Sequence, residues 1–315
     1  MPSNTSPFLM PTGYFSISLG LGATAIAWFH ASHLLPFAEN IGNVIGIISV
    51  MSWLLFSGLY VYKIIRYTEQ VKDEWNCPVR FSFIALIPIT TMVVGDILYH
   101  WQVIFAEPLI WLGAISQLIF AGIRIGGLWK GDVFTEDSTL PPFYLPSVAA
   151  NFTSASSLAL LGYTDLAYVF FGAGVIAWLI FEPVLLQYLR TNKINSAMRG
   201  SFGIILAPAF VGVAAYITIN GGDVDTFAKM LWGYGFLQLI FLFRLLPWIT
   251  QNNFSIGLWA FSFGLASMAN SAISFYQHTQ LEYLSIVVFF FANAMIFLLC
   301  LGTLKTIIQG KFWLK

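Results

Sequence analysis

Long apolar segments alternate with short polar stretches along the whole chain. Hydropathy, read together with the positions of proline, glycine and charged residues, predicts ten membrane-spanning helices. Each segment has about 20 residues, the length that a helix needs to cross a bilayer. The predicted spans cover residues 14–35, 41–62, 81–99, 103–123, 144–162, 165–189, 201–219, 226–247, 255–276 and 281–308. The pattern predicts an all-α polytopic membrane protein with one transmembrane domain over residues 1–315.

Composition strengthens this interpretation. Hydrophobic residues make up 58% of the chain and charged residues only 9%, whereas a soluble domain has about 25% charged residues. A soluble globular protein is therefore excluded. The net charge of zero does not indicate a nucleic-acid partner. The two cysteines, Cys77 and Cys300, form neither a disulfide framework nor a metal-ligand spacing, and we expect no metal and no cofactor.

The basic residues are distributed asymmetrically between the predicted loops. Only Lys229 lies with the odd-numbered loops, which carry acidic residues and all four histidines. By the positive-inside rule, this segregation predicts that both termini are cytoplasmic. The even-numbered connections and the C-terminal tail hold 13 of the 14 basic residues: Lys63, Arg66, Lys72, Arg80, Arg124, Lys130, Arg190, Lys193, Arg199, Arg244, Lys305, Lys311 and Lys315.

Two kinds of predicted span alternate. The odd-numbered spans are rich in Gly, Ala, Ser and Thr, as in SFGIILAPAFVGVAAY, whereas the even-numbered spans are bulky and apolar, as in FLQLIFLFRLL. Small residues permit close helix approach, and hydroxyl groups inside a bilayer face other helices or water. We expect the five odd spans to form an inner layer and the five even spans to face lipid.

Helix-weakening residues recur in the odd spans at a regular interval. Gly20, Pro88, Pro146, Pro208 and Gly264 are separated by 68, 58, 62 and 56 residues, about the length of two spans with their loops. Proline removes one backbone hydrogen bond and bends a helix, which is tolerated at membrane depth where the helix lines a cavity. The interval predicts five helical hairpins in a quasi-five-fold arrangement, with five inner helices around a pore.

Helical spacing identifies candidate pore-lining faces. Phe263, Ser267 and Asn270 share one face of the span at 255–276, and Ser147 and Asn151 share a face of the span at 144–162. None of these faces carries a full charge, so we expect a lining without acidic groups that holds anions weakly. The alternative interpretation is that these are helix-packing faces, which are common in membrane proteins.

Several long segments resemble one known family. FSFIALIPITTMVVGD at 81–96, FYLPSVAANFTSASSLALLGY at 143–163 and IGLWAFSFGLASMANS at 256–271 are similar to bacterial tellurite-resistance proteins of the TehA type. These belong with the slow anion channel of plant guard cells and fungal malate and sulfite transporters in the voltage-dependent anion channel and malic acid transporter family. The resemblance implies a homotrimer with one pore in each subunit, closed by a phenylalanine that corresponds to Phe263. Gly264 would give that ring room to move.

Two carboxylates and the histidines require separate interpretation. Intramembrane carboxylates are candidates for proton relays, but Glu182 lies on an outer span, where Arg190 or Arg124 is a possible partner, and Asp96 lies near the membrane interface. We favour structural pairing for both. For the histidines, a solvated position at the ends of the spans is favoured over metal ligation or pH sensing; they are His30, His33, His100 and His278.

These observations predict a gated channel for small inorganic anions such as chloride or nitrate, embedded in the lipid bilayer of the bacterial inner membrane. The resemblance also links it to tellurite resistance. The alternative is a proton-coupled carrier of dicarboxylates or oxyanions such as malate, sulfite or tellurite. Under that alternative, Glu182 or Asp96 is essential. An enzyme that reduces or methylates tellurite ranks last, because the sequence contains no reactive cysteine pair or cofactor motif.

Overall fold

The computed structural model describes residues 10–131 and 139–313, and every regular element within them is helical. Five long helices have mostly exposed side chains: α2 (Ala38–Arg66), α5 (Ala106–Arg124), α7 (Thr164–Thr191), α9 (Thr226–Ile249) and α11 (Glu282–Ile308). Five shorter helices are mostly buried: α1 (Phe15–Ala31), α4 (Leu86–His100), α6 (Ala150–Leu160), α8 (Ala207–Ile219) and α10 (Ser262–His278). A further short helix, α3 (Thr68–Asn76), follows α2.

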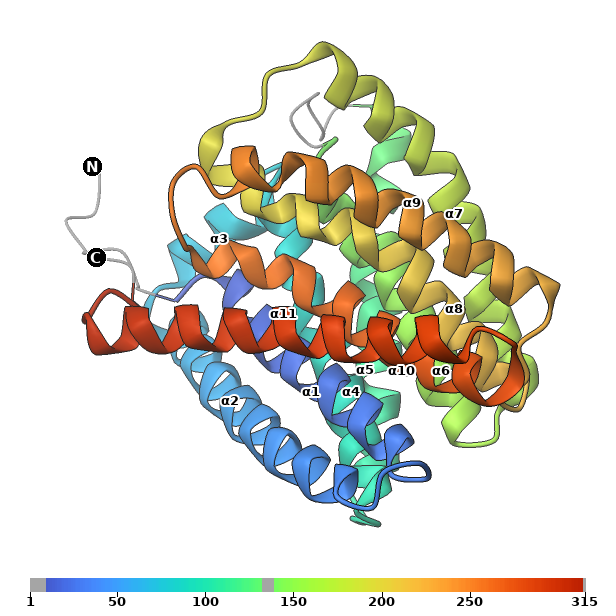
Figure 1. The fold of residues 1–315 in the computed structure, drawn as a ribbon. Coiled ribbons are helices and arrows are strands. Elements are labelled where there is room, and N and C mark those ends of the chain that lie inside the picture. Colours follow the sequence, from blue (N-terminus) through green and yellow to red (C-terminus); the bar gives the residue numbers. More distant parts are fainter. Residues whose placement is uncertain (1–9, 132–138, 314–315) are drawn as a thin grey trace.

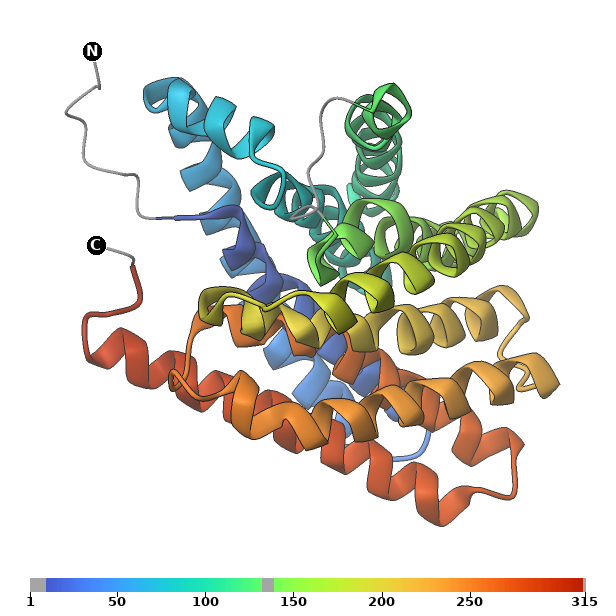
Figure 2. The same ribbon diagram turned by 90° about the horizontal axis from the view of Figure 1, so that it is seen from above.

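Consecutive helices pack as pairs around a closed cycle. Each short helix contacts the long helix that follows it, giving the pairs α1–α2, α4–α5, α6–α7, α8–α9 and α10–α11. The short helices also contact one another in the order α1, α4, α6, α8, α10 and back to α1. Figures 1 and 2 show the helix pairs following one another from α1 and α2 (blue) to α10 and α11 (red). The cycle closes where α10 contacts α1. The short helices therefore form an inner layer.

Burial confirms the two kinds of helix predicted from composition. In the most apolar window of Arg80–His100, 78% of the residues are buried, whereas 22% are buried in the corresponding window of Ala38–Arg66. Spans rich in small residues pack against other helices on most sides, because small side chains let helix backbones approach closely. The bulky spans leave most of their apolar surface uncovered by protein, as expected of helices in contact with lipid.

Eight helices in the described residues have the length and apolar composition to cross a membrane. The two remaining predicted spans, 14–35 and 144–162, correspond to α1 and α6, which are shorter. Both are preceded by other helical turns: η1 (Thr12–Tyr14) before α1, and the 3₁₀ turn η5 (Pro141–Phe143) and π turn η6 (Leu145–Ala149) before α6. Ten crossings remain a prediction from the sequence.

The inner spans change helix type close to the predicted breakers. The 3₁₀ segments η2 (Arg80–Ala85), η7 (Ser196–Leu206) and η8 (Ile256–Phe261) continue directly into α4, α8 and α10. The breakers fall in the first turn after each junction, with Pro88 third in α4, Pro208 second in α8 and Gly264 third in α10. Pro146 is second in η6. Proline fits at these places because the first turn of an α-helix does not need every backbone N–H.

Charged residues occupy opposite ends of the long helices. An acidic residue lies in the first turn of α2, α5, α7 and α11, and a basic residue lies in the last turn of each. This polarity also complements the helix dipole. Because the long helices all begin at the same end of the molecule (Figure 1), one end is acidic and the other is basic. The structure thus reproduces the charge segregation seen between the loops of the sequence.

Candidate functional site

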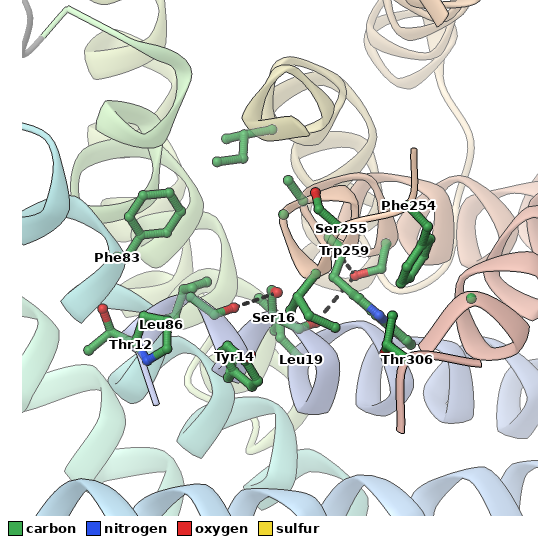
Figure 3. A pocket seen from close by; sticks show the side chains of 18 of the residues that line it. Thr12, Tyr14, Ser16, Leu19, Phe83, Leu86, Phe254, Ser255, Trp259 and Thr306 are labelled. Atoms are coloured by element: carbon green, nitrogen blue, oxygen red, sulfur yellow. Dashed lines mark hydrogen bonds between the residues drawn. The ribbon is translucent and has the colours of Figure 1, made fainter. Parts of the chain in front are cut away.

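A large cavity lies at the basic end of the molecule. It has a volume of about 800 Å³ and is lined by η1, η2, η7, η8 and the end of α11. Its walls include Arg80, Lys305 and Lys311, and we call it the basic cavity. Figure 3 shows side chains that surround it, among them Tyr14, Phe83 and Trp259. All five inner spans begin at this cavity, because residues at or beside each inner helix start line its wall: Tyr14, Leu86, Leu145, Ala207 and Ser262.

A second cavity of about 920 Å³ lies at the other end of the same helices. It is lined by His30, His33 and His100, together with Asp96 and Glu107, and we call it the histidine cavity. Exposed residues at the ends of α4 and α5 form part of its wall, so it reaches the surface. The inner helices therefore run from the basic cavity to the histidine cavity.

A small central cavity of about 50 Å³ lies between the two large ones. Its volume is enough for one or a few water molecules. Phe263 lines both the central and the basic cavity, whereas Asp96 and Asn270 line both the central and the histidine cavity. The three cavities therefore form one series through the inner layer. The residues around the central cavity are Ala23, Ile26, Val93, Asp96, Thr153, Ser156, Val211, Ala214, Ala215, Phe263, Ser267 and Asn270.

Phe263 stands at the junction of the basic and central cavities. It is the second residue of α10, immediately after the 3₁₀ segment η8, and its side chain is 8% exposed. Gly264 follows it, and a Cβ atom on Gly264 would lie 3.1 Å from the backbone and side chain of Leu206. The glycine thus permits close packing of α10 against the end of η7. Phe263 is thus a lining residue of both of these spaces.

The predicted face of α10 lies toward the cavities. Ser267 and Asn270 line the central cavity, and Asn270 Oδ1 is 2.9 Å from His30 Nδ1. The face predicted on the span at 144–162 is placed differently. Ser147 and Asn151 line none of the three cavities, and their side chains donate to the backbone carbonyls one turn earlier, at 2.9 and 2.7 Å.

The other predicted pore-lining or kink positions lie in helix contacts. Gly20, Pro88, Pro146 and Pro208 are buried and line none of the three cavities. Gly20 is a close-approach position, because a Cβ atom there would lie 2.1 Å from Ser262 Oγ on α10.

Asp96 is the acidic residue nearest the middle of the series. Its side chain is 9% exposed, and its Oδ2 atom accepts a hydrogen bond of 2.9 Å from Ser157 Oγ. Its Oδ1 atom is buried and has no hydrogen-bond partner among the described residues. The expectation of cavity walls without acidic groups is therefore wrong, since Asp96 lines the central cavity and Glu74 and Glu107 line the two larger ones.

Comparison with known proteins identifies the family of the chain. The sequence profile of the voltage-dependent anion channel family, SLAC1, matches residues 10–307. The chain belongs to this family. It is 60% identical over 311 residues to the tellurite resistance protein TehA homolog of Haemophilus influenzae, covering 99% of this chain and 95% of that protein.

More distant relatives of this family member are plant and fungal proteins. It is 24% identical to the guard cell S-type anion channel SLAC1 of Arabidopsis thaliana over 98% of this chain and 57% of the plant protein. It is also 24% identical to the sulfite efflux pump SSU1 of Arthroderma benhamiae, over 80% of this chain and 78% of the fungal protein. The proteins of the family are thus described as channels or transporters of anions.

Glu182 of this family member lies outside the three cavities and has neutral partners. Its carboxylate accepts hydrogen bonds from Trp178 Nε1 at 2.9 Å, from Tyr234 Oη at 2.7 Å and from Gln238 Nε2 at 3.2 Å. The Tyr144 hydroxyl also donates to it. The expected pairing with an arginine is wrong: Arg190 donates to Gln187 Oε1, and Arg124 packs over the Phe81 ring. Glu182 instead joins α7 and α9 to the residue before η6.

The histidines are partly bonded rather than simply solvated. Besides the His30–Asn270 bond, His100 Nε2 lies 2.8 Å from Glu39 Oε1, and the His100 ring stacks on Phe29. Within residues 10–131 and 139–313, no group of three or more His, Cys, Asp or Glu side chains is arranged to hold a metal ion.

Sequence reasoning missed the cavity-facing residues of α6. Thr153 and Ser156, three residues apart on that helix, line the central cavity, and Leu160 continues the same face to the histidine cavity. The spacing of these residues was a usable signal. The neighbouring Ser147 and Asn151 obscured it, because they are more polar yet bond to their own helix.

Proposed function

We propose that this protein is a gated channel for small monovalent anions such as chloride and nitrate, with its own pore in each subunit. The observation that carries the proposal is the series of three cavities, in which Phe263 lines both the basic and the central cavity. A buried ring in a narrow passage prevents an ion from keeping its hydration shell, so the passage conducts only when the ring swings aside. Phe263 is the proposed gate.

Electrostatics support a preference for anions. The five inner helices begin at the basic cavity, so the positive ends of their dipoles point toward it. Arg80, Lys305 and Lys311 add charge there and raise the local anion concentration. Besides Asp96, the central cavity is lined by the hydroxyl and amide groups of Ser156, Ser267 and Asn270, which bind an ion through dipoles and so favour rapid release.

The proposal includes an arrangement in the membrane. All ten helix segments cross the bilayer of the bacterial inner membrane as five hairpins with quasi-five-fold symmetry, and both termini are cytoplasmic. The basic end then faces the cytoplasm, in agreement with the positive-inside rule. By resemblance to the family, the subunits form a homotrimer. Because the Haemophilus influenzae relative is named a tellurite resistance protein, the proposal links anion flux in this chain to tellurite resistance.

The test is an electrophysiological comparison in chloride and in nitrate. The native protein, Phe263→Ala and the control Glu182→Gln are expressed in oocytes or whole cells. We expect near-zero current from the native protein and a large, anion-selective, ohmic current from Phe263→Ala. Glu182→Gln, outside the cavities, is expected to give the same near-zero current as the native protein. Equal currents from the native protein and Phe263→Ala would refute the gate.

One observation favours a second candidate, a proton-coupled carrier of dicarboxylates or oxyanions such as malate, sulfite or tellurite. Asp96 places a buried carboxyl group in the wall of the central cavity, where a coupling proton could bind. A carrier predicts uptake that saturates with substrate and follows a pH gradient, and that is abolished in Asp96→Asn. A channel predicts a current whose reversal potential follows the anion gradient alone.

A further inference from the structure

Asp96 presents a problem for any anion that uses the central cavity. As a carboxylate it would place a negative charge in the wall of a space of about 50 Å³, where the passing anion must also lie. Two like charges at such a separation repel strongly when little water screens them. With Oδ2 bonded to Ser157, the second oxygen, Oδ1, has no protein partner although it is buried. An unpartnered buried polar atom is uncommon and needs an explanation.

We propose that Asp96 is a proton-dependent ligand of the passing anion: protonated, its carboxyl group donates a hydrogen bond into the central cavity, and ionised, it repels the anion. This inference rests on the proposed channel function and adds its regulation. Protonation converts an acceptor-only group into one with a donor. The Ser157 hydroxyl donates to Oδ2, and the buried Oδ1 has no partner, so the carboxyl group has one oxygen left that can take up a proton.

The position of Asp96 determines the side from which protons arrive. It lines both the central and the histidine cavity, whereas the proposed gate, Phe263, lines the central and the basic cavity. Protons therefore reach Asp96 through the histidine cavity, which the proposed orientation places outside the cell. Acidification on that side is therefore expected to increase the current. In a variant that lacks the Phe263 ring, protons can also enter from the basic side.

Other ionisable groups share the histidine cavity and must be distinguished from Asp96. α1 and the turn after it contribute His30 and His33, α4 contributes Tyr99 and His100, and α5 contributes Glu107. α2, which also packs on α4, places Glu39 against His100. α6 and α10 present neutral groups, namely the hydroxyls of Ser156 and Ser157 and the amide of Asn270. Among these ionisable groups, Asp96 is the one that also lines the central cavity.

The experiment uses Phe263→Ala as background, so that the ring does not limit the current. Nitrate currents are recorded in planar bilayers while the pH of each side is varied separately. We expect acid on the histidine-cavity side to increase the current, with half-activation at a higher pH as nitrate rises, because proton and anion binding are reciprocally linked. Adding Asp96→Asn, a neutral donor of equal size, should raise the current at neutral pH about tenfold or more and remove the pH dependence.

Matched variants make the outcome decisive. Glu107→Gln removes another acid from the histidine cavity and should keep the pH dependence, as should His30→Gln. Asp96→Ser is a second neutral donor in case Asp96→Asn does not fold. Persistent acid activation in both Asp96 variants would overturn the proposal and assign the sensor to another group. A reversal potential that follows the proton gradient would also overturn it, in favour of a carrier.

A binding measurement separates this proposal from the channel itself. Nitrate is added to purified native protein and to Asp96→Asn, and its effect on thermal stability is measured across pH. We expect nitrate to stabilise the native protein more at acidic pH and to stabilise Asp96→Asn equally throughout. The absence of this difference overturns the role of Asp96, whatever the currents show. The presence of the difference, without current in Phe263→Ala, overturns the channel and retains Asp96 as an anion ligand.

Discussion

Gly20 allows a quantitative test of how the inner helices pack. A Cβ atom at this position would lie 2.1 Å from Ser262 Oγ and 2.4 Å from Ser262 Cβ, whereas ordinary contact begins at 3.4 Å. Rotation of the serine side chain moves Oγ but not Cβ, which is fixed to the backbone of α10. Gly20→Ala must therefore push α1 and α10 apart by about 1 Å, and overpacking of this kind costs about 1–3 kcal/mol.

The free energy of unfolding in an SDS titration, followed by circular dichroism, measures this effect. Ser262→Gly removes both clashing atoms, so the double variant should recover most of the loss relative to Ser262→Gly alone. Gly172→Ala in α7 is the control: no atom lies within 4 Å of its Cβ position, and the change should stabilise the protein by about 0.5–1 kcal/mol. An unchanged stability in Gly20→Ala, or no recovery in the double variant, would refute the packing role. Altered conductance at full stability would instead support the predicted pore-lining role.

Two further predictions concern hydrogen bonds outside the cavities. Glu182→Gln replaces one acceptor oxygen with a donor among four donating groups, so the free energy of unfolding should fall by about 1–3 kcal/mol; native stability in the SDS titration would contradict this. Asp225 caps α9 through Ala228 N at 2.9 Å, and its bond from the Tyr216 hydroxyl lowers its pKa from the ordinary 3.8. Because the pKa of Asp225 is lowered in the folded state, this stabilisation is present at neutral pH and is lost as pH falls through the lowered pKa. The difference in unfolding midpoint between the native protein and Asp225→Ala should therefore shrink in that acidic range. A difference that stays constant with pH would exclude the linkage.

The inner and outer layers could be predicted from composition, because the small residues of a span are also what allow it to be buried among other helices. Spans of small residues must pack against other helices, and the burial of Arg80–His100 and Ile256–His278 agrees with that expectation. The helix-weakening residues also mark real features of the inner spans, but these features are changes of helix type rather than bends. Pro88 and Pro208 lie in the first turn after a 3₁₀ segment rather than at a bend within one continuous α-helix. Sequence shows that a helix is interrupted and not which helix type precedes the interruption.

The details of the candidate site were harder to predict, because they depend on pairings between distant segments. Phe263 and Asn270 could be placed on one helix face from their spacing alone, and both line the central cavity. Asp96 was assigned to the membrane interface, because nothing in its own span shows that Ser157, 61 residues later, would hold it beside that cavity. Among the four donors around Glu182, Trp178 lies on the same helix, but Tyr144, Tyr234 and Gln238 come from distant segments that the sequence near Glu182 does not indicate.

The contact of Tyr14 with Phe312 and Trp313 bears on how this architecture can be rearranged. The Tyr14 hydroxyl donates to the Phe312 carbonyl, and the Tyr14 ring stacks on Trp313 with 5.8 Å between the ring centroids. The cycle of inner helices also closes between α10 and α1. The first and last hairpins are thus neighbours in the same sense as any consecutive pair. A circular permutation that links the segments next to Tyr14 and Trp313, with new ends in the turn between α6 and α7, is expected to keep the helix contacts and to alter the order of synthesis.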